Sequence, residues 1–280
     1  MKDDFYTFGG GHFWEDVFFY QKWRIQRNYI TKKCRLLDNW DIRRHEGYFE
    51  ECRQAFLKYI EAYEIARQKG HMIIMIHSLG QSKNIFKPLW RAAIKRGFLA
   101  AAVNYPSSQK DLEAHVKQFH FFLDHLEDIE TISFVTFGAG SAVLQRLLSG
   151  KAGWQSRLKI SRIVEVAPAI RGNALLDYLS RSKLFGFIIG PMGQDLAPEK
   201  VSKLPQIQGI ETGIVLSNPS FIEKVMAAFT GAKTQKLSPE EAQEITGAKE
   251  VIEINDHHFN TLKNERICNC VVNFLKDGRF

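Results

Sequence analysis

Residues 134–144 read Phe-Val-Thr-Phe-Gly-Ala-Gly-Ser-Ala-Val-Leu, and this stretch decides the fold. An apolar run enters a turn of small residues and continues into a segment that suits a helix. A strand that turns sharply into a helix is the setting of the nucleophile elbow, G-x-S-x-G, which presents a reactive serine. On that pattern Thr136 takes the place of the first glycine, Gly138 that of the serine and Gly140 that of the last glycine. The nucleophile position therefore holds a residue without a side chain.

Glycine at this position has a predictable effect on stability. An elbow nucleophile adopts strained backbone angles, which cost on the order of 1–3 kcal/mol for a residue with a Cβ. Gly138 relieves that strain, so it should stabilise the fold while removing the reactive oxygen. Ser141 lies in the first helical turn, ~4.5 Å along the helix axis from the elbow. We expect its hydroxyl to cap the helix, with a nucleophilic role as the alternative.

Strand-like and helix-like segments alternate outward from this turn. Apolar runs bounded by turns predict strands at 71–76, 98–103, 131–136, 162–166, 211–216 and 250–254. Helical spacing predicts helices at about 86–96, 112–126 and 264–275. The alternation predicts an α/β fold, with a mostly parallel central sheet, right-handed crossovers and helices on both faces.

Residues 1–70 lack strand-like alternation. Apolar residues recur at helical spacing in 48–69, and an aromatic-rich segment precedes it, with Phe13, Trp14, Phe18, Phe19 and Trp23. We therefore predict a helical N-terminal extension over 1–70, packed on an α/β-hydrolase-like domain over 71–280.

Composition and charge limit the classes of partner that the chain can bind. The chain has 280 residues, 45% hydrophobic and 25% charged, and its net charge of +7 is concentrated in 22–27, 32–35 and 43–44. These basic runs can be solvated charges on a packed extension, or can contact an anionic membrane surface. No nucleic-acid motif accompanies them, so we expect no nucleic-acid partner. No run reaches the roughly 18 apolar residues of a membrane span, and there is no secretory signal. With four dispersed cysteines, we expect a cytoplasmic protein with reduced thiols and, as the alternative, peripheral membrane contact.

Two further loops should gather with the elbow at the carboxyl ends of the strands. The first is His77-Ser78-Leu79-Gly80, directly after an apolar run, and it can equally be a plain strand-to-helix turn. The second is 255–262, where His257 and then His258 are candidate bases, or only surface polar residues. A metal site from Asp256 and these histidines lacks further ligands, so we expect no metal and no cofactor.

Motifs along 70–280 resemble a bacterial family of small lipase-like α/β-hydrolases. The matching pieces are Asn-Tyr-Pro-Ser at 104–107, Ala-Pro-Ala-Ile-Arg-Gly at 167–172, Leu-Phe-Gly-Phe-Ile-Ile-Gly-Pro-Met-Gly-Gln-Asp-Leu at 184–196, and the C-terminal Phe-Leu-Lys-Asp-Gly-Arg-Phe. The resemblance implies ester or acyl-lipid hydrolysis through a Ser-His-Asp triad. It also implies that the loop at 77–80 corresponds to the His-Gly loop of lipases, with Ser78 in place of the glycine.

The resemblance assigns roles to particular positions. His257 is the expected triad histidine, and the N–H groups of Leu79 and Ala139 are the expected oxyanion donors. His77, Ser78, Tyr105 and Phe185 are the expected binding residues, with the apolar stretch 184–189 either an acyl pocket or simple core. No Asp stands where the family carries its acid; Lys233 and Thr234 occupy that place, with Glu240 or Asp256 as substitutes.

Three hypotheses follow. The leading one is a catalytically degenerate lipase/esterase-like protein that keeps a cleft for a lipid or acyl ligand, because loss of a triad member leaves only a residual rate. The second is an active ester hydrolase that uses Ser78, Ser107, Ser141 or a water activated by His257. The third is an interaction protein whose cleft is filled and whose extension binds a partner.

Overall fold

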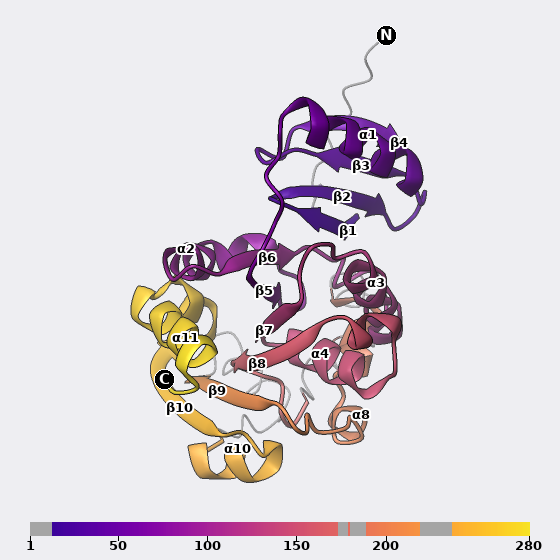
Figure 1. Cartoon of the computed structure of the whole chain (residues 1–280). Helices are drawn as coiled ribbons and strands as arrows, with labels where there is room; N and C mark the ends of the chain where they lie inside the picture. The colour runs from indigo at the N-terminus through magenta and orange to yellow at the C-terminus, as the bar shows by residue number, and fades with distance from the viewer. Residues whose placement is uncertain (1–12, 173–178, 180–188, 219–236) are drawn as a thin grey trace.

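The structure is a computed structural model that describes residues 13–172, 179, 189–218 and 237–280, with only the backbone described for 255–260. Its centre is a six-stranded sheet in the order β10-β9-β8-β7-β5-β6, and every neighbouring pair is parallel. The strands are β5 (His71–Ile76), β6 (Leu99–Val103), β7 (Thr131–Phe137), β8 (Lys159–Val166), β9 (Glu211–Asn218) and β10 (Glu250–His257). The predicted α/β fold with a mostly parallel sheet is confirmed (Figure 1).

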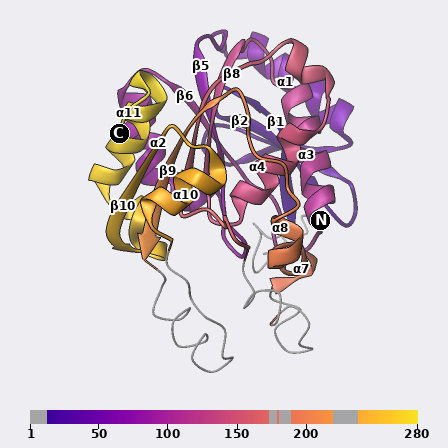
Figure 2. The same cartoon turned by 90° about the horizontal axis from the view of Figure 1, so that it is seen from below.

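Helices cover both faces of this sheet (Figure 2). On one face lie α3 (Leu112–Asp124) and α4 (Gly140–Ser149), and on the other lie α2 (Lys87–Lys95) and α11 (Glu265–Asp277). Each face has its own apolar cluster: Ile74 and Ile76 of β5 belong to the first, and Ile73 and Met75 to the second. The continuous apolar runs of the sequence arise because alternate residues of a buried strand enter different cores.

Shorter elements connect these helices and strands. They are η1 (Lys83–Phe86), η2 (Gly153–Ser156), α7 (Pro191–Asp195), α8 (Pro198–Val201), α10 (Pro239–Thr246) and η3 (His258–Lys263). The start of α10 is set by local chemistry, since Ser238 accepts the N–H of Glu241 and the Glu241 side chain accepts the N–H of Ser238. No helix within the described ranges is long and apolar enough to cross a membrane.

The helical prediction for the N-terminal segment is wrong. Four antiparallel strands, β1 (Trp14–Tyr20), β2 (Trp23–Asn28), β3 (Cys34–Leu37) and β4 (Arg43–Gly47), form a second sheet in chain order. Only α1 (Phe49–Ala62) is helical within 13–70. Successive aromatic residues of β1 point to different cores, Phe18 and Tyr20 into the cluster under α1 and Phe19 into that of the main domain. A strand buried on both faces shows no alternation, and its aromatic spacing mimicked a helix.

Polar contacts join this N-terminal sheet to the main domain, which it caps above β6 and α3 (Figure 1). The Asp16 N–H donates to the carbonyl of Asn104 at 2.8 Å, and the Asn104 N–H donates to the Asp16 carboxylate at 2.7 Å. The amide of Gln118 on α3 donates to both backbone carbonyls, each at 3.0 Å. The N-terminal sheet therefore holds the loop that follows β6.

Candidate functional site

The elbow forms where the sequence predicts a strand-to-helix turn. Gly138 directly follows β7 with a φ of +52°, in the left-handed region, and α4 begins two residues later. Its N–H donates to the carbonyl of Val166 at the end of β8, at 3.0 Å. This conformation strains any residue with a Cβ and suits glycine. The strand-to-helix turn that the elbow pattern predicts is thus present, and the residue between β7 and α4 with a left-handed backbone has no side chain.

Gly140 brings the elbow against the loop that follows β5. A Cβ at this position would lie 2.5 Å from the carbonyl oxygen of Ile76 and 2.9 Å from that of His77. Such distances are well below van der Waals contact, so only glycine permits this approach. The first turn of α4 consequently packs directly against the backbone at 76–77.

Ser78 and Ala139 meet at this contact. The Ala139 N–H, which is the expected oxyanion donor, donates to the Ser78 hydroxyl oxygen at 3.1 Å. Both residues are buried. The hydroxyl of Ser78 thus occupies the N–H that the family resemblance assigns as an oxyanion donor. Leu79, the second expected donor, is half-buried beside the first apolar cluster.

The side chains of His77 and Tyr105 contact the loop that carries Ser78. Their rings stack with centroids 4.2 Å apart, and both side chains are buried. The Tyr105 hydroxyl donates to the His77 carbonyl at 2.5 Å, while His77 Nδ1 lies 2.9 Å from the Ser78 carbonyl. His77 Nε2 lies 3.4 Å from the Tyr105 N–H, so a neutral ring with its proton on Nδ1 satisfies both contacts. The two side chains position the loop.

Burial shifts the pKa values of the groups around these rings. The Tyr105 pKa is raised, because burial disfavours the phenolate. His115 packs edge-on against the Tyr105 ring, and burial, with a smaller effect of Lys110, lowers its pKa to about 3. The Tyr105 and His115 side chains are therefore neutral at pH 7.

Ser141 is neither a helix cap nor positioned for attack. Its hydroxyl donates to the Gly138 carbonyl at 2.9 Å and accepts the Ala169 N–H at 3.2 Å, and the side chain is buried. It therefore ties the elbow to the loop after β8. That loop begins with Ala167 at a φ of +48°, a strained conformation for a non-glycine residue.

The remaining predicted residues are placed in part. His257 is the last residue of β10, and its backbone pairs with Asn218. It therefore lies at the carboxyl edge of the sheet, as the elbow does. Glu240 is exposed in the first turn of α10. The side chains of Asp256, His257 and His258, the stretch 184–188 with Phe185, and the acid position at 233–234 all lie outside the described residues.

One buried residue near the elbow escaped the sequence analysis. Glu165 of β8 is paired with Thr136 of β7 and is 1% exposed. Within the described ranges neither Glu165 Oε1 nor Thr136 Oγ1 has a hydrogen-bond partner. The available signal was a lone acid inside the apolar run 162–166, because a carboxyl group within a buried strand is rare.

Comparison with known proteins shows the fold. No protein-family model matches this chain, and no curated protein matches it. Many solved structures do. The propeptide form of a lipase from Bacillus licheniformis superposes with a TM-score of 0.55 at 15% identity, over 72% of this chain and 49% of that one. The mature form of that lipase gives 0.53 at 15% identity, over 74% and 91%. This chain therefore spans about half of the propeptide form and most of the mature form.

A lipase from another organism gives the same result. The monoacylglycerol lipase of Paleococcus ferrophilus superposes with a TM-score of 0.51 at 13% identity, over 73% of this chain and 93% of that one. Identities in this range establish architecture and leave activity open. The chain has the α/β-hydrolase fold, which it shares with these lipases.

Proposed function

We propose that this chain is a lipase/esterase-like α/β-hydrolase-fold protein that has lost serine hydrolysis and binds an acyl or lipid ligand at the carboxyl edge of its sheet. The observation that carries the proposal is that two departures from the lipase pattern, at residues 138 and 78, meet at the turn between β7 and α4. Gly138 removes the nucleophile, and the Ser78 hydroxyl occupies the N–H of Ala139. Removal of a triad member leaves a residual rate of roughly 10³–10⁴ over water.

Ligand binding at the same place requires one side-chain rotation. A turn about χ1 of Ser78 releases the Ala139 N–H, which then donates to a carbonyl or carboxylate oxygen. The gain from a new charge-assisted hydrogen bond offsets the loss of the internal one. Saturated fatty acids of increasing chain length test this step by thermal shift, since a ligand that binds only the folded state raises the melting temperature with its concentration. A Gly138→Leu variant fills the position and should abolish the shift.

Fluorophosphonate labelling tests the loss of hydrolysis, because the probe reacts with activated serines without a guess about substrate. The wild-type protein should not be labelled, and Gly138→Ser should be labelled at residue 138, as mapped by mass spectrometry. Gly138→Ser together with His257→Ala should lose that labelling, since an elbow serine needs its base. Stoichiometric labelling of the wild type would overturn the proposal.

One observation favours an active enzyme as the second candidate. The Ser78 hydroxyl lies 3.1 Å from the nitrogen that follows the elbow, which makes it the described hydroxyl best placed to replace the missing nucleophile. The hydroxyls of Ser107 and Ser141 are held by hydrogen bonds: Ser107 accepts the Gly80 N–H at 3.0 Å, and Ser141, in α4, donates to the Gly138 carbonyl at 2.9 Å. Labelling that maps to Ser78 and disappears in Ser78→Ala would establish this alternative.

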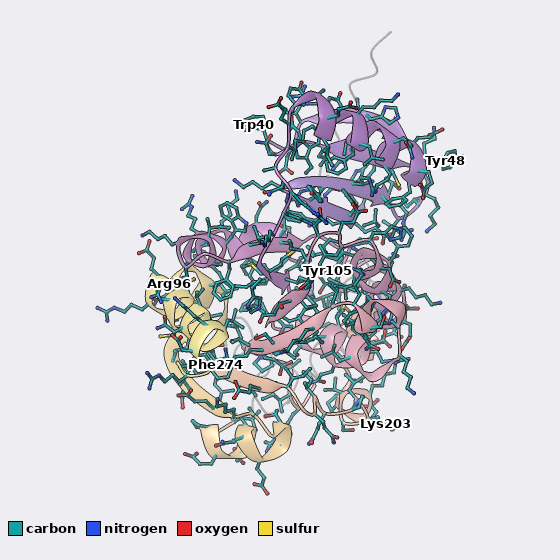
Figure 3. All side chains as sticks on the ribbon, in the orientation of Figure 1. Trp40, Tyr48, Arg96, Tyr105, Lys203 and Phe274 are labelled. Atoms are coloured by element: carbon teal, nitrogen blue, oxygen red, sulfur yellow. The ribbon has the colours of Figure 1, made fainter. Side chains whose placement is uncertain are left out.

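Peripheral membrane contact remains a proposal for the N-terminal sheet. Several basic side chains there are neutralised by ion pairs: Arg24 with Asp16, Arg27 with Glu15 and Arg44 with Asp38. The better anchor is the loop between β3 and β4, where Trp40 is 73% exposed and Ile42 52% exposed (Figure 3). Co-sedimentation with phosphatidylserine vesicles should fall in Trp40→Ser and stay unchanged in Tyr48→Ser, which alters an exposed aromatic residue at the far side of the same sheet.

A further inference from the structure

A pocket lies beside strands β8 and β9. Its other walls come from α4, the segment after α8, and α10. Its described lining includes Glu165, Gln145 and Thr212. It encloses about 100 Å³, which is ample for a small organic group. The amide of Gln206 donates to the Ile245 carbonyl and so links two of its walls. This hydrogen bond joins the segment after α8 to α10 at the pocket.

The lining is chemically divided. Apolar side chains make up part of the wall: Ile170, Val201, Leu204 and Ile207. Hydroxyl and amide groups make up another part, and Glu165 is the one ionisable side chain among the described lining residues. Glu165 is 1% exposed, and its Oε1 has no hydrogen-bond partner in the described part of the chain. A buried carboxyl without a partner is costly, and such groups in native structures usually have a ligand, an ion or a water.

We propose that this pocket binds a small primary amine with a short alkyl chain, whose ammonium group pairs with Glu165. The ammonium supplies the missing donors to Oε1 and the missing counter-charge, while the alkyl chain contacts Val201 and Leu204. A bare alkali cation satisfies the carboxylate and leaves the apolar wall unused. A divalent cation needs about six or more oxygen ligands and would likewise leave the apolar wall unused.

The protonation of Glu165 supplies a readout that does not depend on a variant. Burial raises its pKa to about 7, with no opposing charge among the causes. An ammonium ligand binds the ionised form, so binding at pH 7 should release about half a proton from Glu165 per ligand. Affinity should rise with pH through 7 and stay level until the amine itself loses its proton, near pH 10.

Isothermal calorimetry with n-propylammonium chloride tests the inference. Titration at pH 7 in two buffers of different ionisation enthalpy gives the proton release directly. We expect saturable binding, proton release, and weaker binding by about tenfold or more for n-propanol, propionate and potassium chloride. Absence of saturable heat, or equal binding of n-propanol, would overturn the inference, since either result denies a role for the charge.

Two variants complete the experiment. Glu165→Gln keeps the side-chain shape and removes the charge, so it should lose binding by about tenfold or more and release no proton. Glu199→Gln removes an exposed acid of α8 that does not line the pocket, and it should bind as the wild type does. Unchanged binding in Glu165→Gln would contradict the inference. The inference is independent of what the elbow binds.

Discussion

The carboxylate of Asp16 accepts the backbone N–H of Asn104 at 2.7 Å, and the Asp16 N–H donates back to the Asn104 carbonyl at 2.8 Å. This exchange fixes the loop after β6 to the N-terminal sheet. Tyr105, the next residue, stacks on His77 and so holds the loop that carries Ser78. The N-terminal sheet is thereby connected to the elbow. The path runs from Asp16 through the loop at 104–105 to the loop at 77–78, where the Ser78 hydroxyl accepts the Ala139 N–H.

Asp16→Ala should destabilise the protein by roughly 3 kcal/mol, because it leaves the partners of a buried carboxylate unpaired. Those partners are the Asn104 N–H, the Gln26 amide at 2.7 Å and the Arg24 guanidinium at 3.2 Å. Urea denaturation measures the change. Glu46→Ala removes an exposed acid of the same sheet, paired with Arg43, and should cost less than about 1 kcal/mol. Equal losses for the two variants would refute a special role for Asp16.

Ser78→Gly should strengthen fluorophosphonate labelling of Gly138→Ser. The change frees the Ala139 N–H, which can then donate to the phosphoryl oxygen in the transition state. One oxyanion donor is worth about 10²–10³ in rate. The labelling rate constant of the double variant therefore measures what the Ser78 hydroxyl withholds. Ser78→Ala should show a similar gain and Ser78→Thr none, since threonine retains the hydroxyl. A slower rate in Ser78→Gly would show that the hydroxyl supports the site.

Gly140→Ala should destabilise the fold by about 1–3 kcal/mol, although alanine is the better helix former. The added methyl would lie 2.5 Å from the Ile76 carbonyl oxygen, and backbone must move to accommodate it. Gly150→Ala serves as the control, because its Cβ meets only the His120 ring at 4.0 Å. Thermal unfolding of both variants decides the matter. A neutral result for Gly140→Ala would mean that α4 can retreat from the loop at 76–77.

Stability should fall with rising pH because of Glu165. Burial raises its pKa to about 7, above the ordinary value of 4.5, so the folded state holds a proton that the unfolded state has already released. Between pH 4.5 and 7 folding is therefore progressively disfavoured, by roughly 3 kcal/mol in all. His115 acts in the opposite sense, since its pKa is lowered to about 3 and the unfolded state binds the proton.

The difference between wild type and Glu165→Gln isolates the carboxyl group, because His115 contributes equally to both. The free energy of unfolding of the variant, relative to that of the wild type, should rise from pH 4 to pH 8. Urea titrations at four pH values across this range measure it. A difference that is independent of pH would show that Glu165 is stabilised as its anion by a partner.

The sequence by itself determined the α/β domain. Runs such as 71–76 and 131–136 are apolar because their strands are buried on both faces, and glycines at 138 and 140 mark the turn between β7 and α4. Local composition is enough to predict these elements. Each helix forms its own backbone hydrogen bonds, and each strand pairs with a parallel neighbour. The turn itself could be predicted from the sequence, because glycine readily adopts a left-handed backbone such as the φ of +52° at Gly138.

Only the tertiary structure decided what surrounds the elbow. The Ser78 hydroxyl reaches the Ala139 N–H across 61 positions of sequence, and Asp16 reaches Asn104 across 88. No local pattern encodes such pairs, because they depend on how two finished elements pack. Strand β1 was missed for the same reason, since its second face packs on the main domain through Phe19 and the polar alternation of a surface strand is absent. Glu165 likewise became a candidate ligand only when the structure enclosed it in a pocket without a partner.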